Sequence, residues 1–194
     1  MKKSILSLAL VVLLATTTMA QNISLGVKLG ANISSFTSLP TGTTNGGSGF
    51  GINGGVFARF KIAGFYLQPE LTFSQRAGKL NAPLSETSIT VSYLDLPVLF
   101  GRSFFGGVFR ANLGPVFATA LGSSVDVKTP LGNISGGTVN DLTSFNTGLQ
   151  VGVGSDLGPI TLDLRYEYMF NTISSNSSPR FNGIHFAVGY KFLK

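Results

Sequence analysis

The sequence predicts an all-β fold, an eight-stranded antiparallel up-and-down transmembrane β-barrel with short periplasmic turns and longer extracellular loops. Successive segments alternate apolar and polar side chains, which is the period of a strand and not of a helix. The mean hydropathy is +0.33 and only 11% of the residues are charged, yet no internal apolar run reaches the roughly 18 residues of a membrane helix. Tilted strands of about 9 to 11 residues cross the hydrocarbon of a bilayer instead.

The first twenty residues have the three parts of a secretory signal peptide. A pair of lysines supplies the positive start, Ile5–Ala15 forms an apolar core, and small residues precede the expected cut. Cleavage is therefore expected between Ala20 and Gln21, which leaves residues 21–194 as one barrel domain. The sequence contains no Cys, so neither a lipid-bearing cysteine nor a disulfide is expected.

The first two predicted strands are Ser24–Ser34 and Phe50–Lys61. Each alternates apolar positions with Gly, Asn, Lys or Arg, although Phe57 lies on the otherwise polar face of the second. Between them, Thr37–Gly49 consists mainly of Gly, Thr, Ser and Asn, which is typical of a loop.

The third and fourth predicted strands are Phe65–Arg76 and Ser88–Phe100, with a polar connection at Gly78–Thr87. The apolar residues of the fourth strand change parity midway. We therefore expect a β-bulge near Ser92 or Tyr93.

Four further strands complete the barrel. They are Val108–Leu121, Phe145–Leu157, Ile160–Phe170 and Asn182–Phe192. The third of these, ITLDLRYEYMF, shows the alternation most clearly. Polar stretches separate the odd strands from the next even ones, and tight turns follow the even strands, so the short turns are expected in the periplasm.

Two motifs resemble the paired signature of a known family. They are FYLQPELTFSQRAG at Phe65–Gly78 and YLDLPVLF at Tyr93–Phe100. Together they resemble the small outer-membrane β-barrels called PorT-like, often labelled "porin family". The resemblance implies a location in the outer membrane of a Gram-negative cell and insertion by the barrel assembly machinery. One departure is the end of the chain at Lys194, where such barrels usually end on an aromatic residue.

Alternation alone also fits a soluble barrel with an apolar interior, so the polar face has to decide between the two. That face is rich in glycine, at Gly26, Gly30, Gly51, Gly55, Gly114, Gly148, Gly152, Gly154 and Gly189. On a solvated strand surface this much glycine costs stability without return. Inside a narrow barrel it makes room for large side chains. We therefore expect the polar face inside and the apolar face against membrane lipid.

The inward positions hold most of the charged residues. We expect a network of ion pairs in the lumen from Lys28, Arg59, Glu70, Arg76, Asp95, Arg110, Asp163, Arg165 and Glu167, because buried ions persist only when they are paired. Cations outnumber acids among the inward positions, so Lys61 and Lys191, near strand ends, are expected to reach water.

No catalytic or cofactor motif stands out. His185 is the only histidine, which excludes a cluster of His metal ligands. It could form a hydrolase-like triad with Asp95 or Asp163 and a serine, but a hydrogen-bonded lumen residue is the simpler interpretation. The pI is about 9.8, yet basic residues are scattered singly through apolar strands, so we expect no nucleic-acid partner. No cofactor or metal is expected.

The longest connection, Gly122–Ser144, is the expected functional segment. Alternation continues in it through Val125, Asp126, Val127 and Lys128 and is followed by Leu131, which indicates a hairpin that extends beyond the membrane. We therefore expect a non-enzymatic outer-membrane barrel with a structural, interaction or attachment role through its outer loops, in contact with lipid and with an extracellular or secretion-system protein. The alternatives are a small pore or secretion-system component and, third, a barrel-embedded enzyme.

Overall fold

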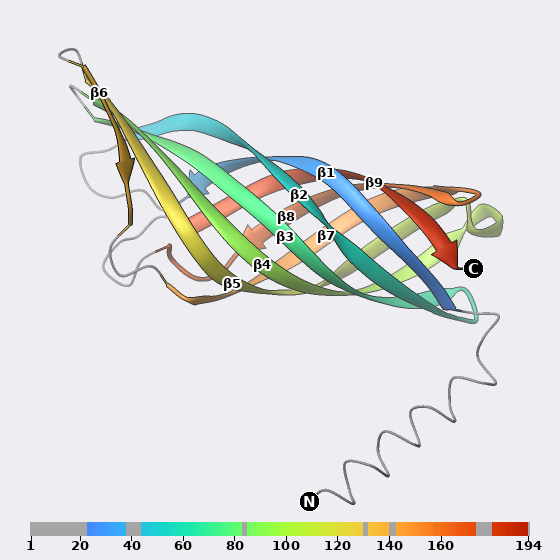
Figure 1. The fold of residues 1–194 in the computed structure, drawn as a ribbon. Coiled ribbons are helices and arrows are strands. Elements are labelled where there is room, and N and C mark those ends of the chain that lie inside the picture. Colours follow the sequence, from blue (N-terminus) through green and yellow to red (C-terminus); the bar gives the residue numbers. More distant parts are fainter. Residues whose placement is uncertain are drawn as a thin grey trace, which may run out of the picture.

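The computed structural model describes residues 23–37, 44–82, 85–129, 132–139, 143–173 and 180–193. They form one antiparallel barrel (Figure 1). The strands are β1 (Ile23–Thr37), β2 (Thr44–Ile62), β3 (Phe65–Ala82), β4 (Ser85–Phe104), β5 (Phe109–Thr129), β6 (Gly132–Gly137), β7 (Phe145–Leu157), β8 (Ile160–Met169) and β9 (Arg180–Leu193). The expected signal peptide, with its cut between Ala20 and Gln21, lies outside the described residues. None of the helices in the described part of the chain is long and apolar enough to span a bilayer.

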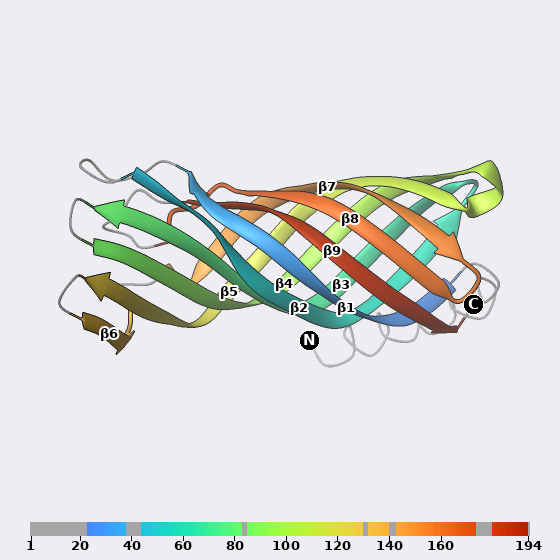
Figure 2. The ribbon, with the colours of Figure 1, turned by 90° about the horizontal axis from the view of Figure 1, so that it is seen from above.

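Eight strands close the barrel, as the sequence predicts. Each pairs with its neighbour in order, β1 pairs with β9, β4 pairs with β5, and β5 pairs with β7, so that only β6 stands outside the ring. The strands are inclined to the long axis of the barrel and wind around it (Figure 2). Closure leaves no free strand edge within the ring. In the hydrocarbon of a bilayer, where no water can bind the backbone, every N–H and C=O group then has a partner on a neighbouring strand.

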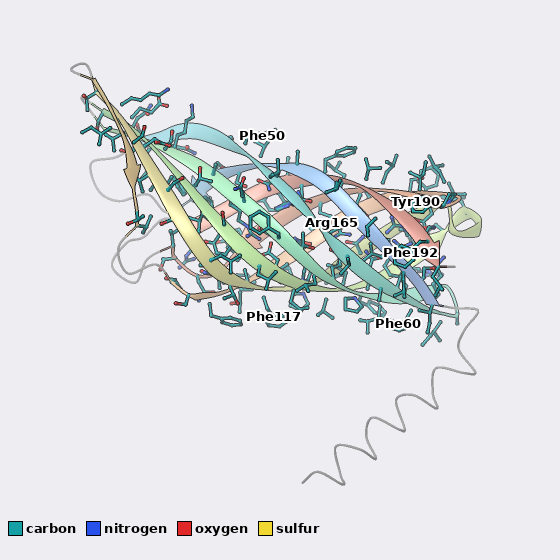
Figure 3. All side chains as sticks on the ribbon, in the orientation of Figure 1. Phe50, Phe60, Phe117, Arg165, Tyr190 and Phe192 are labelled. Atoms are coloured by element: carbon teal, nitrogen blue, oxygen red, sulfur yellow. The ribbon has the colours of Figure 1, made fainter. Side chains whose placement is uncertain are left out.

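Strand β8 shows how the alternation divides the two faces. Thr161, Asp163, Arg165 and Glu167 are buried in the barrel, whereas Leu164 between them is 50% exposed. Figure 3 shows the same division for the labelled residues, with Arg165 inside and the labelled aromatic side chains outside. The apolar surface therefore faces outward and the charged one inward, which rejects the soluble barrel with an apolar interior.

The two ends of the barrel differ. At one end, here called the turn end, short turns join β2 to β3, β4 to β5 and β7 to β8. The first strand, β1, begins at this end, and the last strand, β9, ends there (Figure 1). Backbone hydrogen bonds hold this end together, from Ser103 to Gly64 at 2.9 Å and from Lys191 to Pro159 at 2.8 Å. The opposite end is called the loop end.

At the loop end the strands are longer than predicted. The expected connection Gly78–Thr87 is mostly paired backbone, with Lys79 opposite Ser88 and Asn81 opposite Glu86. β2 likewise begins at Thr44, inside the expected loop. The reason is that ladder hydrogen bonds come from the backbone and do not require apolar side chains. Beyond the lipid the apolar alternation ends, and the sequence signal for a strand ends with it.

The predicted bulge is present, but in the neighbouring strand. Ser92 pairs with Gly122 and Tyr93 with Ala120, so the extra residue is Leu121 in β5. The pairing of β4 with β3 runs through the same point without a shift. The change of apolar parity in β4 has another cause, because its loop-end half carries apolar side chains into the barrel.

Candidate functional site

Arg165 is at the centre of one group of ion pairs in the barrel. Its Nη1 and Nη2 each donate a 2.8 Å hydrogen bond to an oxygen of Glu70 on β3, and Nη2 also lies 3.3 Å from Asp163. Lys28 on β1 pairs with Glu70 as well. Arg110 on β5 reaches Asp163 from the other side, at 3.3 Å. Ion pairs across the lumen thus join the residues of this group, all of which the sequence predicts to face inward.

Asp156, near the end of β7, links this group to the turn end. Its carboxylate lies 2.6 Å from Arg59, 2.9 Å from Arg110 and 3.1 Å from Lys191. The sequence analysis missed Asp156 because it lies next to the predicted turn. Its parity, shared with Gly152 and Gly154 on the lumen face, was the signal that could have identified it.

The expectation that Lys191 reaches water is wrong. The residue is only 5% exposed and its ammonium pairs with Asp156. The additional acid reduces the excess of positive charge on which that expectation rested and gives Lys191 a partner inside the barrel. Lys61 is partly exposed, as expected.

A second group lies closer to the loop end. Arg76 on β3 pairs with Asp95 on β4 at 2.9 Å and with Glu167 on β8 at 2.6 Å. Gln150 donates a 2.8 Å hydrogen bond to Glu167, and His185 Nε2 lies 3.4 Å from the same carboxylate. His185 is therefore a lumen residue beside an ion pair, and the acid next to it is Glu167, not the Asp95 or Asp163 considered for a triad.

All nine residues of the predicted network are buried and face the lumen. They are Lys28, Arg59, Glu70, Arg76, Asp95, Arg110, Asp163, Arg165 and Glu167. Several of the ion pairs, among them Arg165–Glu70, Arg76–Glu167 and Arg59–Asp156, connect strands that are far apart around the ring, so they brace the barrel from inside. Burial of this many ions is tolerable because each has an opposite charge within reach.

The inward glycines provide the space for these side chains. A Cβ atom on Gly152 would lie 2.5 Å from Cγ of Arg165, and one on Gly26 would lie 2.5 Å from the ring of Phe57. Phe57, the apolar residue on a polar face, is buried in the lumen, and the guanidinium carbon of Arg59 lies 5.6 Å from its ring centre. The inward glycines thus leave the space that the large inward side chains occupy.

An apolar layer closes the lumen at the loop end. It consists of Phe36, Val91, Tyr93, Ala118, Met169, Ile173 and Phe181. The rings of Phe36 and Phe181 lie 5.0 Å apart, and the guanidinium carbon of Arg76 lies 4.6 Å from the ring centre of Tyr93, where the apolar layer meets the ion pairs. The sequence pattern does not predict this layer, because some of its members stand on otherwise polar faces and others, such as Phe36 and Phe181, lie beyond the predicted strands.

Among the side chains of the network there is a cavity of about 20 Å³. Lys28, Asn53, Asp95, Gln150 and His185 contribute to its wall. Its volume suits a single water molecule. In the described part of the chain, no three His, Cys, Asp or Glu side chains are grouped as a metal site would require.

The expected outer hairpin is present. β5 continues past the ring and pairs with β6, with Val127 opposite Ile134 and Thr129 opposite Gly132. Asp126 and Lys128 are exposed, whereas Val125 and Val127 are partly buried. Leu131, the remaining predicted residue of this loop, lies outside the described residues. Among the described strands β6 pairs only with β5, so no described strand covers its second edge (Figure 1).

Comparison with known proteins gives one family match and several similar structures. The family described as outer membrane protein beta-barrel domain matches residues 19–175. Neisserial surface protein A is 16% identical, over 87% of this chain and 97% of its own, with a TM-score of 0.49. Ail, the attachment invasion locus protein of Yersinia pestis, is 13% identical over 88% and 99%, with a TM-score of 0.46. The N-terminal β-barrel domain of Pseudomonas aeruginosa OprF is 11% identical over 85% and 97%, with a TM-score of 0.37. No curated protein sequence matches the chain.

Proposed function

This chain belongs to the outer membrane protein beta-barrel domain family, and on that premise we propose that it is a non-enzymatic attachment protein that binds another protein through the strands beyond its barrel. In outer-membrane barrels the short turns face the periplasm. The loop end of this barrel, with the β5–β6 hairpin, then faces the outside of the cell.

The observation that carries the proposal is the open edge of β6. The ladder between β4 and β5 runs out to the pair of Glu86 with Lys128, and β6 extends the same sheet by one strand. A strand with an open edge presents unpaired backbone N–H and C=O groups, to which an extended segment of another protein can add. Ile134 on β6 is 68% exposed and supplies an apolar contact beside that edge.

The filled lumen supports a surface role over conduction. An eight-stranded barrel has only enough interior for side chains. Here the two groups of ion pairs occupy it, and the apolar layer around Phe36 and Phe181 lies above them. A pore would need a continuous polar path, and an enzyme would need a cleft for its substrate. Neither a pore nor an enzyme inside the barrel would need a hairpin that extends beyond the ring.

The experiment compares the adhesion of cells that display the wild-type chain with that of cells that display variants. The surface is a plate coated with a mixture of matrix proteins. Replacement of residues 126–140 by a short Gly-Ser turn should abolish adhesion, while the barrel folds as before, as judged by heat-modifiable gel mobility. Equal adhesion by this variant would contradict the proposal.

A matched pair of point variants separates the edge from the rest of the hairpin. Ile134→Lys places a charge on the edge strand and should weaken adhesion, because charged residues on an edge oppose strand addition. Lys128→Ala is the control. Lys128 is exposed and lies on β5, and at this point β5 is already paired with β4 on one edge and with β6 on the other. This variant should leave adhesion unchanged.

A further inference from the structure

Arg102 is a charged residue on the apolar outer face of the barrel. It follows Leu96, Val98 and Phe100 at alternate positions of β4 and is exposed on the same side. Its guanidinium carbon lies 5.3 Å from the ring centre of Phe65. In the described part of the chain, Arg102 forms no ion pair with an acidic side chain. An arginine on a lipid-facing surface without an acidic partner requires a counter-charge from the surroundings.

Its side chain is held in place at the turn end. The guanidinium carbon also lies 5.6 Å from the ring centre of Phe104, the last residue of β4. Stacking on two aromatic rings is favourable for arginine and leaves the N–H groups at the edge of the guanidinium free to donate. The position suits the level of the lipid headgroups, where aromatic and basic residues anchor barrels and helices.

A groove on the outer surface begins at Arg102. It has a volume of about 570 Å³ and is lined by Phe100, Ala111, Val153 and Leu164, among others. This volume lies within the roughly 300 to 1,000 Å³ of small-molecule sites. An adjoining groove of about 410 Å³ shares Ala111, Val153 and Leu164. The surface is hollowed at this point because Ala111 has a small side chain between larger neighbours.

The register of the strands gives the groove a direction. Arg102 pairs with Ala111, Ala111 with Val153, and Val153 with Leu164. Arg102 is close to the end of β4 and Ala111 to the start of β5, whereas Leu164 lies near the middle of β8. This row therefore climbs from the turn end into the middle of the membrane. A molecule that follows it has its head at Arg102 and its tail in the hydrocarbon.

We propose that Arg102 and this groove bind a phospholipid of the periplasmic leaflet, with the phosphate at the guanidinium and an acyl chain along Ala111, Val153 and Leu164. Guanidinium and phosphate form charge-assisted, two-point hydrogen bonds. A headgroup with a net negative charge is favoured over a zwitterionic one, because no acidic side chain offsets Arg102. The site is on the barrel wall and is independent of the outer hairpin.

The test uses tryptophan fluorescence, because the chain contains no tryptophan. Phe100→Trp places a reporter in the groove. Tyr190→Trp places a control on β9, which is four strands from β4 in either direction around the ring. Both proteins are refolded in phosphatidylcholine vesicles that contain brominated phosphatidylglycerol, which quenches tryptophan on contact. Stronger quenching at Phe100→Trp than at Tyr190→Trp is expected, and equal quenching at the two positions would overturn the proposal.

Two further variants in the Phe100→Trp background identify the cause. Arg102→Gln should lower the relative affinity for phosphatidylglycerol about fivefold, the effect of one basic residue near an anionic lipid surface. Arg102→Lys retains the positive charge and should therefore keep part of the affinity for phosphatidylglycerol that Arg102→Gln loses. Ala111→Leu fills the groove without a change of charge and should also reduce quenching. Unchanged quenching in both Arg102→Gln and Ala111→Leu would show that the reporter senses only bulk lipid, and would overturn the proposal.

Discussion

Arg165 and Glu70 form a two-point ion pair across the barrel, with both hydrogen bonds at 2.8 Å. Arg165 is on β8 and Glu70 on β3, which lie opposite each other in the ring, with β2, β1 and β9 between them on one side and β4, β5 and β7 on the other. The pair therefore ties together distant parts of the wall. Because both side chains are buried, neither can exchange its partner for water without opening the lumen.

Arg165→Leu should destabilise the barrel strongly. The substitution leaves Asp163 and Glu70 with fewer counter-charges in a buried environment, and removal of one partner from such a pair costs about 3 to 5 kcal/mol. Arg165→Lys keeps the charge but cannot form two parallel bonds, so its cost should be smaller. Urea unfolding in detergent micelles measures the free energy of unfolding. Equal stability of Arg165→Leu and the wild type would show that the pair does not brace the barrel.

Leu164→Arg should destabilise the protein in lipid vesicles by about 2 to 4 kcal/mol, the cost of an arginine on the lipid face near the bilayer midplane. Leu157→Arg is the matched control, since Leu157 is also exposed but is the last residue of β7 at the turn end. It should cost about 0 to 1 kcal/mol. Equal costs for both variants, measured by unfolding from vesicles, would contradict the assignment of the outer face to lipid.

Gly101→Val should destabilise the barrel by about 1 to 3 kcal/mol, the usual cost of overpacking an interior. A Cβ atom on Gly101 would overlap the ring of Tyr66 in the lumen. Gly122→Val is the control, because no atom lies within 4 Å of the position of its Cβ. Its free energy of unfolding should match that of the wild type. If the two variants were equally stable, the inward glycines would not be needed to clear space.

Export provides a separate prediction. The mature protein should begin at Gln21 when it is isolated from the outer-membrane fraction, because the small residues before it fit a signal-peptide cleavage site. N-terminal sequencing or intact mass measurement gives the answer. Recovery of Met1 from membrane-embedded protein would refute cleavage after Ala20.

The sequence predicts the ring and its two faces well because both depend on a period of two. In β8 that period alone places Leu164 outside and Arg165 inside, and the structure has both where they were expected. The nine charged lumen residues were identified in the same way. Their pairing is not predicted, because the partner of Arg165 on β3 depends on the register of the four strand pairs that separate β8 from β3 on either side of the ring.

The alternating pattern misleads where the polarity of a side chain does not match the face of the strand on which it lies. Val91 points into the barrel but is apolar, so its parity alone predicts a displacement of β4 by a bulge. Asp156 points inward but lies next to a turn, so it was not counted. At the loop end, Ser, Thr and Asn form long paired strands that have no apolar face to reveal them. In each case a local pattern was insufficient, because the side chain contacts residues that are distant in the sequence.

The proposed surface role requires a barrel interior that does not conduct ions. Single-channel recording of the purified, refolded protein in a planar bilayer tests this most directly. The ion pairs of Arg76 and Arg165, with the apolar layer beside them, fill the interior of an eight-stranded barrel, which has room only for side chains. Insertion should therefore produce no stable conductance steps, whereas steps of the size of a porin channel would show that the barrel is an open pore.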